Sequence, residues 1–219
     1  MEIENLSMFI WRDTRTNNCN TYLIDGPAPV LIDPGHTRFF QGVCRELVEA
    51  GFDPQRLALA LNTHGHPDHV EGSEVFTELN AYVAIHEKEY EFIEPLFRTF
   101  YQSQGIAPPD IVFDLFLREG EITSGDHTFE ILHTPGHSPG SVCVYWPAKR
   151  ALFSGDVIFK QGVGRTDLPG GSVRDLAMSI QRLRELDVEL LLPGHGEPVE
   201  GKEEVERNFE MATRQLNFM

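Results

Sequence analysis

Residues 57–69 read LALALNTHGHPDH, an apolar stretch that runs directly into a polar cluster. A short apolar run bounded by turn-forming residues is typical of a buried strand, so we expect the cluster to lie where that strand ends. The six positions 64–69 hold three of the nine histidines and one aspartate: His64, His66, Asp68 and His69. Since imidazole and carboxylate groups are ligands for zinc and iron, the sequence predicts a metal site at this sheet edge.

Three later segments repeat the arrangement in which a strand ends, a glycine turn follows and a ligand-type side chain comes next. They are HTPGHSPG (133–140) with His137, FSGDVIF (153–159) with Asp156 and LLPGHGE (191–197) with His195. A single histidine after a strand is more often a satisfied surface or core residue than a ligand. Together with the first cluster, however, the three segments supply seven ligands, a number that suits two metal ions sharing one carboxylate.

The segment 136–140, GHSPG, also satisfies the G-x-S-x-G pattern of a serine hydrolase nucleophile. That pattern requires a strand, a sharp turn and then a helix, whereas PGSVCVYW (139–146) predicts a turn into another strand. We therefore interpret Ser138 as a turn residue and His137 as the functional residue. His133 is expected to end a strand outside the metal set.

Strands and helices are grouped along the chain. Short β-rich runs separated by turns come first, an amphipathic helix follows at 38–51, and a later helix begins at the N-cap Ser172. This grouping predicts an α+β fold in which two mixed sheets pack face to face with helices outside. We expect one domain over residues 1–219. Residues 87–118, rich in glutamate and aromatics and broken by prolines, are expected to form an inserted cap.

Composition narrows the function classes. The formal charge of −16 opposes unaided binding to nucleic acid or an anionic membrane. The chain shows neither a signal-type start nor an apolar run near the roughly 20 residues of a membrane helix, so we expect a soluble cytoplasmic protein. Cys19, Cys44 and Cys143 form no C-x-x-C pair, which favours reduced thiols; Cys44 and Cys143 are expected to be buried as small hydrophobes.

The order of LIDPG (31–35), THGHPDH (63–69), TPGH (134–137), SGD (154–156) and PGHG (193–196) resembles the metallo-β-lactamase superfamily. The resemblance implies a four-layer αβ/βα sandwich with a one- or two-metal site at its edge. It assigns His64, His66 and His137 to the first metal, assigns Asp68, His69 and His195 to the second, and lets Asp156 bridge them. Asp33 would steady the ligand loop from outside the site; as a lone aspartate it is equally consistent with a turn former.

The chemistry that this arrangement implies is hydrolysis. Metal binding lowers the pKa of water towards about 7, and two metals roughly 3.5–4 Å apart can hold a bridging hydroxide as the nucleophile. Asp68 would orient that hydroxide and accept its proton. We expect two divalent metal ions, with zinc as the first choice, while the same ligands also accept iron or manganese.

Within the superfamily, THGHPDH, HTPGHSPGS and GVGRTDLPGG (162–171) are most similar to glyoxalase II-like (hydroxyacylglutathione hydrolase-like) thioesterases and their relatives. We therefore predict a hydrolase of small thioesters or esters. About 23 residues follow PGHG, enough for one helix, whereas a typical glyoxalase II has a helical C-terminal region that helps bind glutathione. Arg165 either pairs with a substrate carboxylate or forms an internal salt bridge with Asp167.

Three alternatives remain. The first is a persulfide dioxygenase with a single Fe(II) held by His64, His137 and Asp156. The second is a nuclease, which the acidic charge disfavours, and the third is a non-enzymatic metal-binding module, which the complete ligand set disfavours. The sequence leaves the oligomeric state open, a dimer included.

Overall fold

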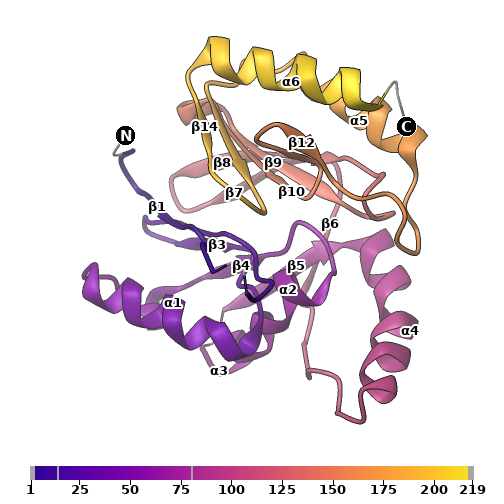
Figure 1. The fold of residues 1–219 in the computed structure, drawn as a ribbon. Helices are drawn as coiled ribbons and strands as arrows, with labels where there is room; N and C mark the ends of the chain where they lie inside the picture. The colour runs from indigo at the N-terminus through magenta and orange to yellow at the C-terminus, as the bar shows by residue number, and fades with distance from the viewer. Residues whose placement is uncertain (1–2, 14, 80, 217–219) are drawn as a thin grey trace.

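The computed structural model describes residues 3–13, 15–79 and 81–216 of the 219-residue chain. Its main strands form two six-stranded sheets (Figure 1). Sheet A contains, in spatial order, β1 (Leu6–Phe9), β2 (Thr21–Ile24), β3 (Val30–Ile32), β4 (Leu59–Leu61), β5 (Tyr82–His86) and β6 (Leu115–Leu117). The pairs from β1 to β3 are antiparallel and those from β3 to β6 are parallel, so sheet A is mixed.

Sheet B is also mixed. It contains, in spatial order, β14 (Val199–Glu200), β13 (Leu190–Pro193), β10 (Ala151–Gly155), β9 (Val142–Trp146), β8 (His127–His133) and β7 (Gly120–Ser124). β10 and β13 run parallel, and the other neighbours are antiparallel. A separate antiparallel pair is formed by β11 (Ile158–Phe159) and β12 (Gly162–Val163).

The described residues form six helices. They are α1 (Thr37–Glu49), α2 (Pro67–Val70), α3 (Phe76–Leu79), α4 (Glu87–Ser103), α5 (Val173–Leu183) and α6 (Lys202–Leu216), with short 3₁₀ turns at Pro54–Arg56, Glu71–Val75 and Pro147–Lys149. In Figure 1, α1 and α3 lie outside sheet A, and α5 and α6 lie outside sheet B. The Ser172 hydroxyl accepts a hydrogen bond from Asp175 N at 3.2 Å, which confirms the predicted N-cap of α5.

Alternation along the strands produces the four layers. In sheet A, Ile24 and Ile32 are buried between the two sheets, whereas their neighbours Leu23 and Leu31 pack against the α1 side. Sheet B repeats the pattern, because Phe153 faces sheet A while its neighbour Leu152 packs against α5 and α6. Successive side chains of a strand point to opposite faces, so each sheet buries both of its faces. The predicted α+β sandwich of two mixed sheets is confirmed.

Residues 87–118 are more regular than the sequence indicated. They begin with α4, which has 17 residues and continues through Pro95, and they end with β6, which joins sheet A. Pro95 removes one hydrogen bond from the helix interior. Pro95 and Glu91, whose carbonyl loses that partner, lie on the exposed face of α4, where water can replace the lost donor.

Smaller predictions about burial are partly wrong. Cys143 is buried in β9 as expected, but Cys44 on α1 is only half-buried. Val48, in the predicted amphipathic helix, is 60% exposed because Phe40, Val43 and Leu47 already fill the contact of α1 with sheet A. Among the described residues, no helix is both long enough and apolar enough to cross a membrane.

Candidate metal centre

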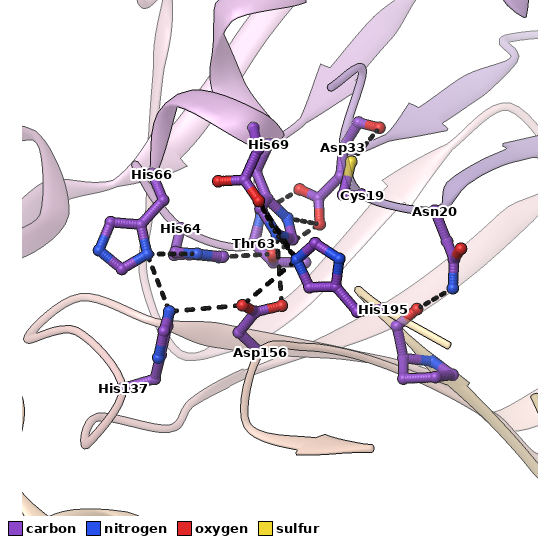
Figure 2. A network of polar contacts seen from close by, with 12 residues as sticks. Cys19, Asn20, Asp33, Thr63, His64, His66, His69, His137, Asp156 and His195 are labelled. Carbon is purple, nitrogen blue, oxygen red and sulfur yellow. Dashed lines mark hydrogen bonds and ion pairs between the residues drawn. The ribbon is translucent and has the colours of Figure 1, made fainter. Parts of the chain in front are cut away.

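Four loops meet at one edge of the two sheets and carry the side chains that the sequence predicted to bind metal (Figure 2). The loop after β4 carries the cluster 64–69, in which α2 begins at Pro67. The loops after β8, β10 and β13 contribute one side chain each. The predicted ligands form overlapping groups of three residues, and within each group the ligand-type atoms lie within 4.8 Å of one another. These groups include all seven predicted residues: His64, His66, Asp68, His69, His137, Asp156 and His195.

The first group contains three histidines. His66 Nδ1 lies 3.0 Å from His64 Nε2 and 2.8 Å from His137 Nε2. Burial lowers the pKa of His64 and lowers that of His66 to about 4, so both rings are neutral at neutral pH. Neutral imidazole nitrogens that converge in this way present lone pairs to a shared point, which is what a bound cation requires.

The second group contains Asp68, His69 and His195. His195 Nε2 lies 3.2 Å from both Asp68 Oδ2 and His69 Nε2. Burial raises the pKa of Asp68, but the neighbouring His195 and His69 outweigh burial and hold that pKa well below its ordinary value. Asn17 Nδ2 donates a hydrogen bond of 2.6 Å to Asp68 Oδ2, so the ionised carboxylate has a fixed orientation.

Asp156 lies between the two groups. Its Oδ1 is 3.3 Å from His69 Nε2, and its Oδ2 is 3.5 Å from His137 Nε2 and 3.6 Å from His195 Nε2. Burial raises the pKa of Asp156, yet His69 and the other histidines outweigh burial and lower it to about 2. The buried Oδ1 makes no hydrogen bond within the described part of the chain. An ionised, unsatisfied oxygen beside converging nitrogens is costly without a cation, so the donor set fits a metal centre.

The backbone at Gly194 leaves room for Asp156. A β-carbon at Gly194 would lie 2.4 Å from Asp156 Oδ1 and 2.7 Å from His69 Cε1. The glycine that precedes His195 is therefore required by the close approach of the β13 loop to the centre.

Asp33 contacts the ligand-bearing loop from behind. Its carboxylate accepts hydrogen bonds from Thr63 N and Thr63 Oγ1, both at 2.7 Å, and from His69 Nδ1 at 2.9 Å. The bond to Nδ1 leaves His69 Nε2 directed at the centre. Asp33 also has a left-handed backbone, with φ of 52°. Its geometry therefore includes contacts to the ligand-bearing loop and a turn conformation, the two roles that the sequence left open for it.

Glu89 is a site residue that the sequence analysis missed. It lies fully buried on α4 and accepts hydrogen bonds from Gly65 N at 2.9 Å, Ser138 Oγ at 2.8 Å and Gly140 N at 2.7 Å. Gly65 belongs to the first ligand-bearing loop, and Ser138 and Gly140 belong to the second. Burial raises the pKa of Glu89, while these three donors favour its charged form. One carboxylate thus ties α4 to both loops.

Ser138 lies in a turn and is followed by a strand. β8 ends at His133, residues 134–141 form the turn, and β9 begins at Val142. The helix that a serine nucleophile requires after it is therefore replaced by a strand, as the sequence predicted. His133 lies outside the ligand groups, stacks on His86 with ring centroids 4.4 Å apart and donates from Nε2 to Pro139 O at 2.9 Å.

Arg165 forms the internal salt bridge that the sequence allowed. Its guanidinium donates to both carboxylate oxygens of Asp167, at 2.9 and 2.8 Å, and its side chain is 67% exposed. Its carbonyl oxygen accepts a hydrogen bond of 2.8 Å from His137 Nδ1, which directs His137 Nε2 at the centre. Arg165 thus reaches the centre through its backbone, and contact with a substrate carboxylate stays a prediction.

Comparison with known proteins identifies a family and several relatives. A family model described as the metallo-beta-lactamase superfamily matches residues 14–195. The chain is 35% identical over 187 residues to a protein described as probable metallo-hydrolase MJ0888 from Methanocaldococcus jannaschii, with 81% of this chain and 87% of the relative covered. It is also 35% identical over 192 residues to hydroxyacylglutathione hydrolase GloC from Haemophilus influenzae, with 82% and 85% covered.

A solved structure has the same fold. The crystal structure of BLEG-1 B3 metallo-beta-lactamase superposes with a TM-score of 0.77 at 30% sequence identity, and the match covers 93% of this chain and 97% of that one. Members of one superfamily share a fold but can act on different substrates. These comparisons therefore establish the fold, and the substrate follows from the chemistry of the site.

Proposed function

Because the chain belongs to the metallo-beta-lactamase superfamily and is a metallo-hydrolase, we propose that it hydrolyses small thioesters or esters with two bound divalent metal ions. One observation carries the proposal: two three-residue groups converge on either side of the Asp156 carboxylate, whose buried Oδ1 makes no hydrogen bond to the described residues. His64, His66 and His137 would hold one ion, Asp68, His69 and His195 the other, and Asp156 would contact both. Zinc is the first candidate, since neutral imidazole and carboxylate ligands suit it.

When bound, the metal ions would supply a water nucleophile of lowered pKa and a Lewis acid for the substrate carbonyl. The protein's own residues would position the reactants. The Asp68 carboxylate, which Asn17 orients, is ionised and would orient the attacking water as a hydrogen-bond acceptor. The backbone carbonyl of Arg165 and the Asp33 carboxylate fix the ring orientation of His137 and His69, so their Nε2 atoms stay directed at the centre.

The test is an assay of purified, metal-loaded protein against four substrates in parallel. We expect hydrolysis of S-lactoylglutathione or of an uncharged acyl thioester, no hydrolysis of a cephalosporin at a comparable rate, and no O₂ uptake with glutathione persulfide. O₂ uptake without thioester hydrolysis would replace this proposal by the mononuclear iron dioxygenase.

Three variants connect the activity to the site. His64→Ala and Asp156→Ala should each lower kcat/KM at least about 100-fold, because each removes a metal ligand. Ser138→Ala should retain most of the activity while losing about 1–2 kcal/mol of stability, since it removes one buried hydrogen bond to Glu89. A loss of activity in Ser138→Ala equal to that in His64→Ala would contradict a metal-dependent mechanism.

A further inference from the structure

A pocket of about 500 Å³ opens beside the proposed metal centre, and most of its wall is apolar. Four residues of the first ligand-bearing loop line one end, among them His66 and Asp68. The rest of the wall is formed mainly by one face of α4 and by the loop before α5, with the side chains Phe92, Ile93, Leu96, Phe97, Phe100 and Leu168. The volume lies within the range of about 300–1,000 Å³ that is usual for small-molecule sites.

The apolar wall follows from the spacing along α4. Phe92, Leu96 and Phe100 are four residues apart, as are Ile93 and Phe97, so these side chains lie along one side of the helix. Glu89 holds the start of α4 against the two ligand-bearing loops, which fixes this side beside the centre.

Part of the wall is open to solvent. Leu96 is 37% exposed and Phe100 is 48% exposed. Clustered apolar side chains that remain exposed beside a polar site mark a surface for an apolar ligand. Since His66 and Asp68 also line the pocket, a substrate bound at the centre would extend over this wall.

Among the described residues, the pocket wall offers no lysine or arginine to a carboxylate. His36 is paired, because its Nδ1 lies 2.6 Å from Glu71 Oε2. Of the arginines on the elements that form the wall, Arg98 pairs with Glu94 at 2.7 Å and Arg165 pairs with Asp167. A glutathione carrier, which has two carboxylates, would therefore meet an apolar wall without a lysine or arginine to pair with either carboxylate.

We propose that this pocket binds an uncharged apolar group of the substrate, so that the preferred substrates are thioesters or esters with an alkyl or aromatic substituent on an uncharged carrier. This inference rests on the proposed hydrolase function. In the reaction, the oxygen of water bonds to the carbonyl carbon, the carbon–sulfur or carbon–oxygen bond breaks, and the thiol or alcohol leaves with a proton. The apolar group in the pocket is part of either the acyl group or the leaving group of the substrate.

A binding experiment tests the pocket without relying on turnover. Titration calorimetry would measure the Kd of S-ethyl, S-butyl and S-hexyl thioethers of N-acetylcysteamine, which cannot be hydrolysed at an acyl bond. Each added methylene should tighten binding about fourfold until the pocket is filled, since burying one methylene contributes about 0.8 kcal/mol. S-hexylglutathione should bind more weakly than the S-hexyl thioether of N-acetylcysteamine. Equal Kd values from ethyl to hexyl would overturn the proposal.

Two variants localise the effect. Leu96→Lys places a charge in the wall and should abolish the dependence of Kd on alkyl length. Phe100→Ala removes part of the wall and should weaken binding of the hexyl compound about tenfold. Met178→Lys on α5 is the matched control, because Met178 is an exposed apolar helix residue that does not line the pocket. An unchanged length dependence in Leu96→Lys, with the thermal midpoint of the native protein, would also overturn the proposal.

Hydrolysis assays separate this inference from the proposed function. One series varies the acyl group from acetyl to hexanoyl on N-acetylcysteamine, and the other keeps acetyl and varies the thiol from ethyl to hexyl. A rise of kcat/KM with length in one series supports the inference and identifies the side that enters the pocket. Hydrolysis of both series without length dependence would refute the inference alone. No hydrolysis in either series would refute the proposed function, while the thioether Kd values would still decide whether the pocket binds apolar groups.

Discussion

Glu89 connects the two ligand-bearing loops of the candidate centre through hydrogen bonds to residues other than the predicted ligands. Its two carboxylate oxygens accept three hydrogen bonds from two loops that are more than seventy residues apart in sequence. A buried carboxylate of this kind is stabilised only while all of its donors are in place. We therefore assign it a positioning role for both ligand-bearing loops.

Glu89→Ala should lower the free energy of unfolding of the metal-free protein by about 3 kcal/mol, because buried donors of both loops lose their acceptor. It should also weaken metal binding about 10- to 100-fold, as loss of an outer contact of ligand-bearing groups does. Urea unfolding and competition with a chelator measure the two effects. Glu94→Ala on the same helix is the control and should change stability by less than about 0.5 kcal/mol, since its ion pair with Arg98 is exposed. Unchanged metal affinity in Glu89→Ala would limit its role to packing.

His86 gives the protein a predictable response to acid. Burial, together with the neighbouring His133, lowers its pKa from 6.5 to about 4. Between these two values the unfolded chain binds a proton that the folded chain does not bind, so stability is full above pH 6.5 and falls as the pH drops towards 4. His86 Nδ1 also accepts a hydrogen bond from Lys88 N at the start of α4.

His86→Asn should reduce the loss of stability between pH 7 and pH 4.5 by on the order of 1 kcal/mol, allowing for solvent screening. Asparagine keeps an acceptor at the N-cap of α4 and removes the titration. Urea unfolding at the two pH values measures the difference. Equal losses in the variant and the native protein would show that His86 does not contribute to acid sensitivity.

At the scale of elements, α4 packs closely against the second ligand-bearing loop. A β-carbon at Gly140 would lie 2.2 Å from Glu89 N and 2.6 Å from Glu89 Cα, so the helix backbone itself occupies that space. The helix, the loop and the apolar pocket therefore form one rigidly connected unit beside the centre.

Gly140→Ala should destabilise the protein by about 2–3 kcal/mol, because backbone rather than a flexible side chain has to move. Gly42→Ala is the matched control. Gly42 lies inside α1 with no neighbour within 4 Å of the new carbon, so alanine should stabilise the protein by up to about 1 kcal/mol. Thermal unfolding should show a lower midpoint than the native protein for Gly140→Ala and a higher midpoint for Gly42→Ala. Shifts of the same sign in both variants would contradict the packing described here.

The sequence predicted some elements well and others poorly for identifiable reasons. The strands before the ligand-bearing loops and the N-cap of α5 were clear, because apolar runs and caps are local signals. α4 was obscured by Pro95, and β7 (GEITS) was missed because it is largely exposed and lacks an apolar run. The chain turns at Asp156 as the motif predicted, and this turn separates β10 from β11.

The same distinction holds for the candidate site. Its seven predicted ligands follow strand ends in short motifs, so their types and order were visible in the sequence. Glu89 was not, because a glutamate in the first turn of a helix ordinarily serves the helix end. Asn17 was missed as well, since no local pattern indicates that a residue 51 positions before Asp68 will orient its carboxylate.

At the scale of the whole molecule, the centre joins the two sheets. The cluster 64–69 follows β4 of sheet A, whereas His137, Asp156 and His195 follow strands of sheet B. A metal bound by these residues would link the two halves of the sandwich and would bind the folded chain more tightly than the unfolded chain.

Removal of metal with EDTA should therefore lower the thermal midpoint. For metal at 100 times its Kd the stabilisation is about 2.7 kcal/mol, which corresponds to a shift of roughly 5–10 °C for a chain of this size. Asp156→Ala should show little of this shift, since it lacks the carboxylate between the two groups. An equal shift in Asp156→Ala would place the stabilising metal elsewhere.

The most direct test of the central claim is a zinc titration of metal-depleted protein with hydrolysis of an uncharged acyl thioester as the readout. We predict that activity is absent at the start, rises as zinc is added and reaches a plateau near two equivalents per chain. In Asp156→Ala it should stay near the starting level. Full activity in protein that contains no metal, or a plateau reached equally by Asp156→Ala, would contradict a two-metal hydrolase centred on these residues.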